Sequence, residues 1–307
     1  IGKFAEKPRF QGGGSSHINS FKVESALDAV KAYTEVAYAQ GYDVKEDKID
    51  EAMVKEAVET AKNADVAVIF AGLPDAFESE GYDREHMGMP DCQNYLIQEI
   101  LKVQKNIVIV LHNGSPVEMP WADDVSAILE AYLCGQAVGA AEADILFGKV
   151  NPSGKLAETI PYHLEDNPSY LNFPGDGQKV EYKEGVFVGY RYYDMKKMPV
   201  RYPFGYGLSY TTFEYSDLQL SKEKIKDTET LQVSVKVKNT GKMAGKEVVQ
   251  LYVSDKTNAV MRPVNELKNF VKVELQPQEE KTVTMELNKR SFAWYNTKVN
   301  DWYAGSG

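Results

Sequence analysis

The first half of the chain alternates between two patterns of hydrophobic residues. Apolar residues recur at helical spacing in some segments, and continuous β-branched runs lie between them. The helical segments are 51–64, 93–104 and 137–147, and the apolar runs are 65–72, 107–114 and 125–132. A continuous apolar run is typical of a strand covered on both faces. The alternation therefore predicts an α/β sandwich domain, with a mostly parallel sheet flanked by helices.

The later part of the chain has a period of two. Apolar and polar residues alternate in short runs separated by turn residues such as Asn239-Thr-Gly. The runs that predict strands are 231–239, 247–254 and 281–287. This pattern predicts an all-β sandwich of the immunoglobulin or fibronectin type III kind.

The change of period divides the chain into two domains, as its length of 307 residues also favours. We place the α/β sandwich domain at 1–212 and the β-sandwich at 213–307. Residues 151–212 form an irregular connecting segment, dense in Pro, Gly and Tyr. Because ligands of parallel sheets gather at the carboxyl ends of the strands, the loop that follows Gly72 is a candidate site.

Charge, hydropathy and cysteine content limit the kinds of partner and the cellular compartment that we expect. The formal net charge of -10 argues against nucleic acid, whose phosphates the chain would repel. No run approaches the roughly 18 apolar residues of a membrane helix, so we expect no membrane partner. Cys92 and Cys134 form no disulfide framework and favour a reducing, cytoplasmic compartment. Ile1–Glu6 resembles the tail of a strand and 300–307 stops within one. We therefore expect a piece of a larger protein, for which secretion stays open.

Several kinds of chemistry have no support in the sequence. The four histidines lack metal-ligand spacing, so we expect no metal site. The Gly-rich run at 11–16 lacks the Lys of a P-loop and the spacing of a dinucleotide fingerprint, which makes nucleotide binding the weaker alternative. A turn that lets the backbone approach another group closely is the simpler interpretation. We expect no cofactor.

Carboxylates remain, and they crowd the loop after Gly72. The loop contains Asp75, Glu78, Glu80, Asp83, Glu85 and Asp91. Glycoside hydrolysis uses two carboxylates, one of them a general acid with a raised pKa. Glu80 fits the acid, because the neighbouring Gly81 permits an unusual turn that would present its side chain. Asp83 and Arg84 fit a structural pair. The alternative is a solvated loop without catalytic function.

Longer motifs resemble a known family. "ESEGYDREHMGMP" (78–90), "VLHNGSPVEMPW" (110–121), "LFGKVNPSGKLAETIP" (146–161) and "YPFGYGLSYTTFEY" (202–215) resemble, in that order, segments of the glycoside hydrolase family 3 β-glucosidases. The resemblance implies a three-part enzyme with a (β/α)8 barrel, an α/β sandwich domain and a fibronectin type III-like domain. This chain resembles the second and third parts. The nucleophilic Asp of the family lies on the barrel, which is expected at either end of this chain.

The resemblance also implies roles for individual residues. Glu80 matches the general acid/base, and Glu78 is its rival within the loop. Ser15 is the nearest match to a sugar-contacting Ser of the Gly-rich loop, with Ser16 as the alternative. Phe77 matches either a wall of the aglycone side or an anchor of the loop.

The implied activity is that of a retaining exo-acting β-glucosidase, which removes terminal β-D-glucosyl residues from β-glucosides or cello-oligosaccharides. This chain would supply the acid/base, and the barrel of the same protein the nucleophile, so the chain alone should be inactive. A β-xylosidase or another exo-β-glycosidase remains an alternative. So does a non-catalytic carbohydrate-binding or interaction module. Whether the protein forms a homo-oligomer is left open.

Overall fold

A computed structural model describes residues 1–257 and 260–307, and the chain forms two compact units. Unit 1 comprises 1–150 and 162–164, and unit 2 comprises 151–161 and 165–307. By its contacts the connecting segment thus belongs mainly to unit 2. The domain boundary at 212/213 remains a prediction.

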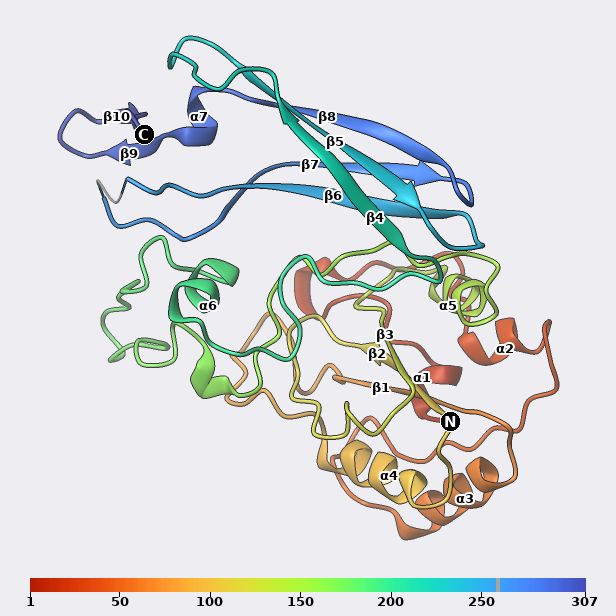
Figure 1. Ribbon diagram of the computed structural model, residues 1–307. Coiled ribbons are helices and arrows are strands. Elements are labelled where there is room, and N and C mark those ends of the chain that lie inside the picture. The colour runs from red at the N-terminus through yellow and green to blue at the C-terminus, as the bar shows by residue number, and fades with distance from the viewer. Residues whose placement is uncertain (258–259) are drawn as a thin grey trace. The chain divides into compact units, whose positions relative to one another are not determined.

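The centre of unit 1 is a parallel sheet in the order β1-β2-β3 (Figure 1). The strands are β1 (Ala67–Gly72), β2 (Ile107–His112) and β3 (Ala127–Glu130). All but one residue of β1 and of β2 are buried, as expected of strands covered on both faces. The predicted α/β domain is confirmed.

Five helices of unit 1 accompany this sheet in the described part of the chain. They are α1 (Lys3–Glu6), α2 (Ala26–Val30), α3 (Glu51–Lys62), α4 (Asp91–Leu101) and α5 (Val138–Leu146). The Asp50 carboxylate accepts the amides of Ala52 and Met53 and so starts α3. The Asp47 carboxylate accepts the amides at the start of α4, which explains why this helix begins two residues before its apolar pattern.

The first six residues differ from expectation. Lys3–Glu6 is helical, and only Ile1 pairs with β1 in the manner of a strand. The amide of Phe70 donates to the carbonyl of Ile1 at 2.9 Å, and the amino group of Ile1 donates to the carbonyl of Val68. Phe4 and Ala5 of α1 are buried, so packing of the apolar face decides this segment.

Unit 2 contains antiparallel strands in two larger sheets and one hairpin. One sheet has the order β4-β5-β8, the second pairs β6 with β7, and the hairpin pairs β9 with β10. The strands are β4 (Phe213–Leu220), β5 (Leu231–Asn239), β6 (Gly245–Val253), β7 (Glu266–Leu275), β8 (Glu280–Leu287), β9 (Trp294–Asn296) and β10 (Asp301–Tyr303). The three strands expected from the period of two are present.

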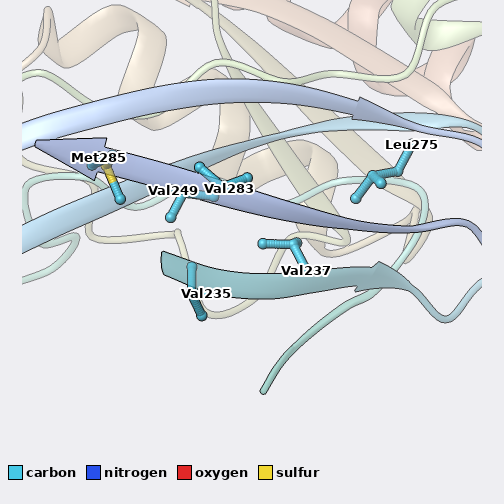
Figure 2. Packing of buried hydrophobic residues seen from close by; sticks show 6 residues of the cluster. All are labelled: Val235, Val237, Val249, Leu275, Val283 and Met285. Atoms are coloured by element: carbon cyan, nitrogen blue, oxygen red, sulfur yellow. The ribbon is translucent and has the colours of Figure 1, made fainter. Parts of the chain in front are cut away.

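The core of unit 2 lies between its two larger sheets (Figure 2). Val235 and Val237 of β5 meet Val249 of β6, and residues of β7 and β8 complete the cluster. Along β5, buried residues alternate with more exposed ones, which is the pattern that a sandwich strand requires.

The connecting segment has little regular structure, as predicted. Within 151–212 the described elements are the 3-10 turn η2 (Leu164–Asp166) and α6 (Tyr190–Lys196); a further short helix, α7 (Lys289–Phe292), follows β8. The Tyr190 hydroxyl accepts the amide of Leu267 in β7 at 2.8 Å, so α6 is fixed to the sandwich strands of its own unit.

Candidate active site

The candidate loop leaves the carboxyl end of β1, where its position depends on Gly72. Gly72 has a φ of +140°, and a Cβ there would lie 2.1 Å from the carbonyl oxygen of His112. The Gln93 side chain holds the amide and the carbonyl of Gly72 at 2.8 and 2.9 Å. The ends of β1 and β2 therefore lie together, and the loops that follow them share one edge of the sheet.

Glu80 lies at the tip of this loop. Ser79 and Tyr82 form an antiparallel bridge, which places Glu80 and Gly81 in the turn between them. The Tyr82 hydroxyl donates to the carbonyl of Asp75 and fixes the turn to its own loop. The Glu80 side chain is exposed. Gly81, expected to supply an unusual backbone angle, does not have a positive φ. A Cβ at Gly81 would meet nothing within 4 Å.

The Gly-rich run meets Glu80. The amide of Ser15, in the 3-10 turn η1 (Gly14–Ser16), donates to Glu80 Oε2 at 2.5 Å. Gly14 has a φ of +84°, and a Cβ there would lie 2.5 Å from Glu80 Cβ. The close backbone approach expected of this run is therefore an approach to the carboxylate-rich loop at 73–91, called the acid loop below. Of the two serines, Ser15 contacts Glu80, whereas the Ser16 hydroxyl donates to the carbonyl of Gly13.

These contacts favour the ionised form of Glu80. Hydrogen bonds from the backbone and the side chain of Ser15 lower the pKa of the Glu80 carboxyl. A general acid needs a raised pKa, which burial supplies. In this chain, by itself, Glu80 is an exposed carboxylate without that burial.

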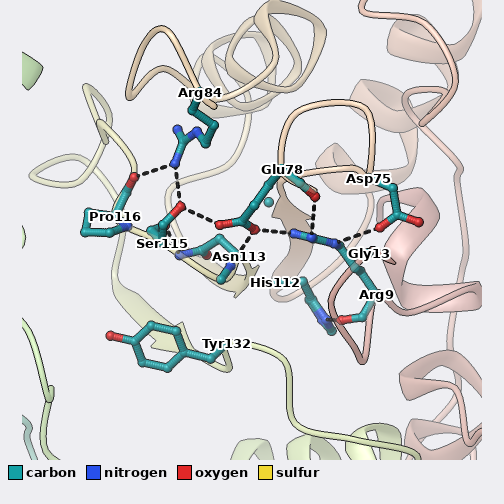
Figure 3. Close-up of polar contacts among 12 residues, drawn as sticks. Arg9, Gly13, Asp75, Glu78, Arg84, His112, Asn113, Ser115, Pro116 and Tyr132 are labelled. Carbon is teal, nitrogen blue, oxygen red and sulfur yellow. Dashed lines mark hydrogen bonds and ion pairs between the residues drawn. The ribbon is translucent and has the colours of Figure 1, made fainter. Parts of the chain in front are cut away.

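Whereas Glu80 is exposed, Glu78, two residues earlier, is half-buried and has several hydrogen-bond donors around it (Figure 3). Its Oε2 accepts Arg9 Nη1 at 2.6 Å and the Gly114 amide at 2.8 Å, and its Oε1 accepts the Ser115 hydroxyl. Burial raises the pKa of Glu78, but the bonds from Ser115, Arg9 and Gly114 outweigh it, so the pKa is lowered. A carboxylate held by this many donors is poorly suited to proton transfer, and Glu78 anchors the loop.

Arg9 is a site residue that sequence reasoning missed. Its side chain is 5% exposed and binds both Asp75 and Glu78. The Arg9 carbonyl lies 3.1 Å from Nδ1 of His112 in β2. Nε2 of the same buried histidine lies 3.0 Å from Oε1 of Glu142, a buried residue of α5. Arg9 and its carboxylate partners are 66 and 69 residues apart in sequence, so no local motif indicates them.

Asp83 and Arg84 do not form the expected pair. Arg84 Nη1 donates to the Ser115 hydroxyl at 2.7 Å and to the Pro116 carbonyl at 3.0 Å, both in the loop after β2. Asp83 is exposed. Neighbouring side chains in a turn point in different directions, so adjacency in sequence was a poor guide. Arg84 still ties the acid loop down, as expected, but it does so across the sheet edge.

The remaining residues singled out by sequence are structural in their contacts. Phe77 is half-buried and meets the His86 ring edge-on at 5.8 Å, which fits a loop anchor. Trp121 is buried, and its Nε1 donates to Asn94. Among residues 1–257 and 260–307, no group of His, Cys, Asp and Glu could hold a metal ion, and no helix is long and apolar enough to cross a membrane.

Residues 1–210 match the glycosyl hydrolase family 3 C-terminal domain, and residues 247–307 match the fibronectin type III-like domain. The chain belongs to glycosyl hydrolase family 3. The fold class expected from sequence, an α/β domain followed by a fibronectin type III-like domain, is thereby confirmed.

The similar proteins named next are longer than this chain. Thermostable beta-glucosidase B of Acetivibrio thermocellus is 58% identical over 100% of the chain, which spans 41% of that protein. An exo-alpha-(1->6)-L-arabinopyranosidase of Bifidobacterium longum is 47% identical over 100% of the chain, which spans 40% of it. The crystal structure of a Bifidobacterium adolescentis family 3 beta-glucosidase matches all of the chain with a TM-score of 0.95 and 48% identity, and the chain covers 45% of it.

Proposed function

We propose that this chain is the acid/base-bearing part of a retaining exo-acting β-glucosidase that hydrolyses terminal β-D-glucosyl residues. Two of the similar proteins described above are named beta-glucosidases. The observation that carries the proposal is the difference between the two candidate carboxylates. Glu80 is exposed at the tip of a fixed turn, whereas Glu78 is bound by Arg9, Gly114 and Ser115.

The second carboxylate, an Asp, would lie on a (β/α)8 barrel in the rest of the longer protein. In a retaining reaction the Asp attacks the anomeric carbon while Glu80 protonates the leaving oxygen, and Glu80 then takes a proton from the water that releases the sugar. The two carboxyl groups must lie about 5 Å apart. The tip of an exposed turn is a suitable place for a side chain that enters a neighbour's pocket.

Assembly with the barrel and substrate would also supply the burial that Glu80 lacks. Removing water from a carboxyl raises its pKa, which offsets the effect of the Ser15 hydrogen bonds. The exposed state of Glu80 in this chain and the raised pKa of a general acid are therefore compatible.

The test is Glu80→Gln in the full-length protein, assayed with aryl β-glucosides of different leaving groups. We expect kcat/KM to fall about 100- to 10,000-fold for glucosides with poor leaving groups, which need the proton, and much less for those with good ones. The control is Glu85→Gln, which changes an exposed carboxylate of the same loop. Equal losses on both kinds of substrate would reject the acid role.

A different sugar specificity is the second candidate, because a similar protein is named an exo-alpha-(1->6)-L-arabinopyranosidase. A β-xylosidase or another exo-glycosidase would use the same acid/base. Comparing kcat/KM of the full-length protein on aryl β-glucosides, β-xylosides and α-L-arabinopyranosides decides between them.

The chain alone should hydrolyse none of these substrates. Turnover by the isolated 307 residues would reject the split site. Tight binding of glucose by the isolated chain would instead favour a carbohydrate-binding module.

A further inference from the structure

The proposed reaction needs two segments that are far apart in sequence to meet at Glu80. The Gly-rich run with Ser15 begins two residues after Arg9, and Glu80 follows two residues after Glu78. We propose that Arg9 is a positioning residue for Glu80, because it clamps the bases of both loops so that their tips meet. The inference rests on the proposed function and adds to it a residue that does not touch the substrate.

The clamp uses three donors of one guanidinium (Figure 3). Arg9 Nε donates to Asp75 Oδ1 at 3.1 Å, Nη1 donates to Glu78 Oε2 at 2.6 Å, and Nη2 donates to the carbonyl of Glu78 at 3.0 Å. The third bond matters most for position, because it fixes the backbone of the acid loop as well as a side chain.

The other side of the clamp is fixed to the sheet. The Arg9 carbonyl accepts a hydrogen bond from Nδ1 of His112, the last residue of β2. Because a carbonyl oxygen can only accept, Nδ1 of His112 carries the proton. His112 is fully buried, so this contact joins the start of the Gly-rich run to a rigid strand end.

Only short stretches of chain connect the clamped bases of the two loops to their tips, so the tips are also held in position. One residue lies between Glu78 and Glu80, and five lie between Arg9 and Ser15, whose amide donates to Glu80 Oε2 at 2.5 Å. A displacement of about 1 Å in a catalytic group can lower the rate about 100-fold. Lysine in place of Arg9 would keep the charge but cannot reproduce the planar fork of donors.

The test uses Arg9→Gln and Arg9→Lys in the full-length protein. For Arg9→Gln we expect kcat/KM to fall up to about 100-fold on β-glucosides with poor leaving groups and clearly less on those with good ones. Arg9→Lys should show the same selective loss, because it cannot bind both Asp75 and the Glu78 carbonyl. The basic limb of the pH profile, which reports the acid, should move in both variants.

Arg262 provides a matched control. Its side chain is also little exposed, at 9%, and it binds Glu266 and the carbonyl of Phe292 in unit 2. Arg262→Gln should lower the melting temperature as Arg9→Gln does, yet leave the ratio of kcat/KM between the two kinds of substrate unchanged. A lowered melting temperature with an unchanged ratio in both Arg9 variants would overturn the positioning role.

A double variant separates this inference from the proposed function. If Arg9 acts through Glu80, Arg9→Gln should cost little further selectivity in a Glu80→Gln background, and additive losses would overturn the proposal. If Glu80→Gln alone shows no dependence on the leaving group, the proposed function fails instead.

Should Arg9→Gln not fold, Asp75→Asn replaces it, since Asp75 is an exposed partner of Arg9 Nε. It should show the same selective loss on a smaller scale, and an unchanged ratio would overturn the clamp.

Discussion

The base and the tip of the acid loop are two residues apart and are built in opposite ways. At the base, Glu78 is half-buried and bound by two other parts of unit 1, the Arg9 side chain and the loop after β2 with Gly114 and Ser115. At the tip, Glu80 is exposed and bound by Ser15 alone among the contacts recorded for the described residues. Two carboxylates of one loop thus differ in their contacts: Glu78 holds the loop in place, and Glu80 has an exposed side chain, for which we propose the chemical role.

The largest expected effect is on stability, and it should separate the two carboxylates. Glu78→Ala leaves the buried Arg9 guanidinium without its shortest ion pair, and breaking a buried pair costs about 3–5 kcal/mol. Because Glu78 is partly exposed, we expect the lower end, about 3 kcal/mol. Calorimetry of the full-length protein should show a lower melting temperature for Glu78→Ala. Glu80→Ala should leave it unchanged, and equal shifts would contradict the division.

The second prediction tests the junction between the Gly-rich run and the tip. Gly14→Ala places a methyl group 2.5 Å from Glu80 Cβ at a residue with a φ of +84°, so the turn or Glu80 must move. Strain of about 1–3 kcal/mol at such a position, if it falls on the active arrangement, corresponds to roughly a 5- to 160-fold loss of kcat/KM. Gly81→Ala is the matched control, since a Cβ there meets nothing within 4 Å. Comparable losses in the two variants would rule out a specific role for Gly14.

The elements of both units were largely predictable because their signals are local. Apolar period and β-branched runs indicated β1, β2, β5 and β8, and each of them is a buried or alternating strand. The edge strand β4 carries the alternation only in two short pieces, Phe213 with Tyr215 and Leu218 with Leu220, on either side of a register shift between Ser216 and Gln219. Seven of its eight residues are exposed, so burial does not mark this strand.

The candidate site was predictable only in part, because its contacts join residues that are far apart in sequence. The sequence indicates Glu80 through its neighbour Gly81 and through the family resemblance. For the Gly-rich run it predicts a close approach of the backbone to another group, without naming that group. That its neighbour is Glu80 follows from tertiary structure, as does the contact of Arg9 with Glu78 across 69 residues. Arg84 was assigned to Asp83 because the two are adjacent, but its bonds go to Ser115 and Pro116 instead.

The third prediction concerns the two serines of the Gly-rich run and should be smaller. Ser15→Ala removes a hydroxyl that contacts Glu80 but keeps the amide that donates to Oε2. A net loss of one hydrogen bond, about 1 kcal/mol, corresponds to roughly a fivefold change in kcat/KM. Ser16→Ala should change kcat/KM less, because the Ser16 hydroxyl bonds within its own loop. The opposite ranking would assign the sugar-side role to Ser16.

The smallest expected effect is a pH dependence, and its sign follows from the environment of Glu78. Its pKa in the folded chain lies below the ordinary value of 4.5, since the donors around it outweigh burial. A carboxyl of this kind stabilises the fold above its unfolded pKa, and the stabilisation disappears as the pH falls through the folded pKa. The gap in unfolding free energy between the full-length protein and Glu78→Gln should therefore narrow below about pH 4.5.

Glu80 sharpens this pH test, because its pKa is lowered as well, by Ser15, while its side chain remains exposed. Solvent screens an exposed carboxylate, so Glu80→Gln should change the pH dependence of stability less than Glu78→Gln does. Denaturant unfolding at pH 7 and pH 4 would measure the difference in unfolding free energy between the full-length protein and each of the two variants. A gap that widens on acidification for Glu78→Gln would mean that burial, and not its donors, controls that carboxyl. Glu78 would then be the better candidate for a general acid, and the roles of base and tip would be exchanged.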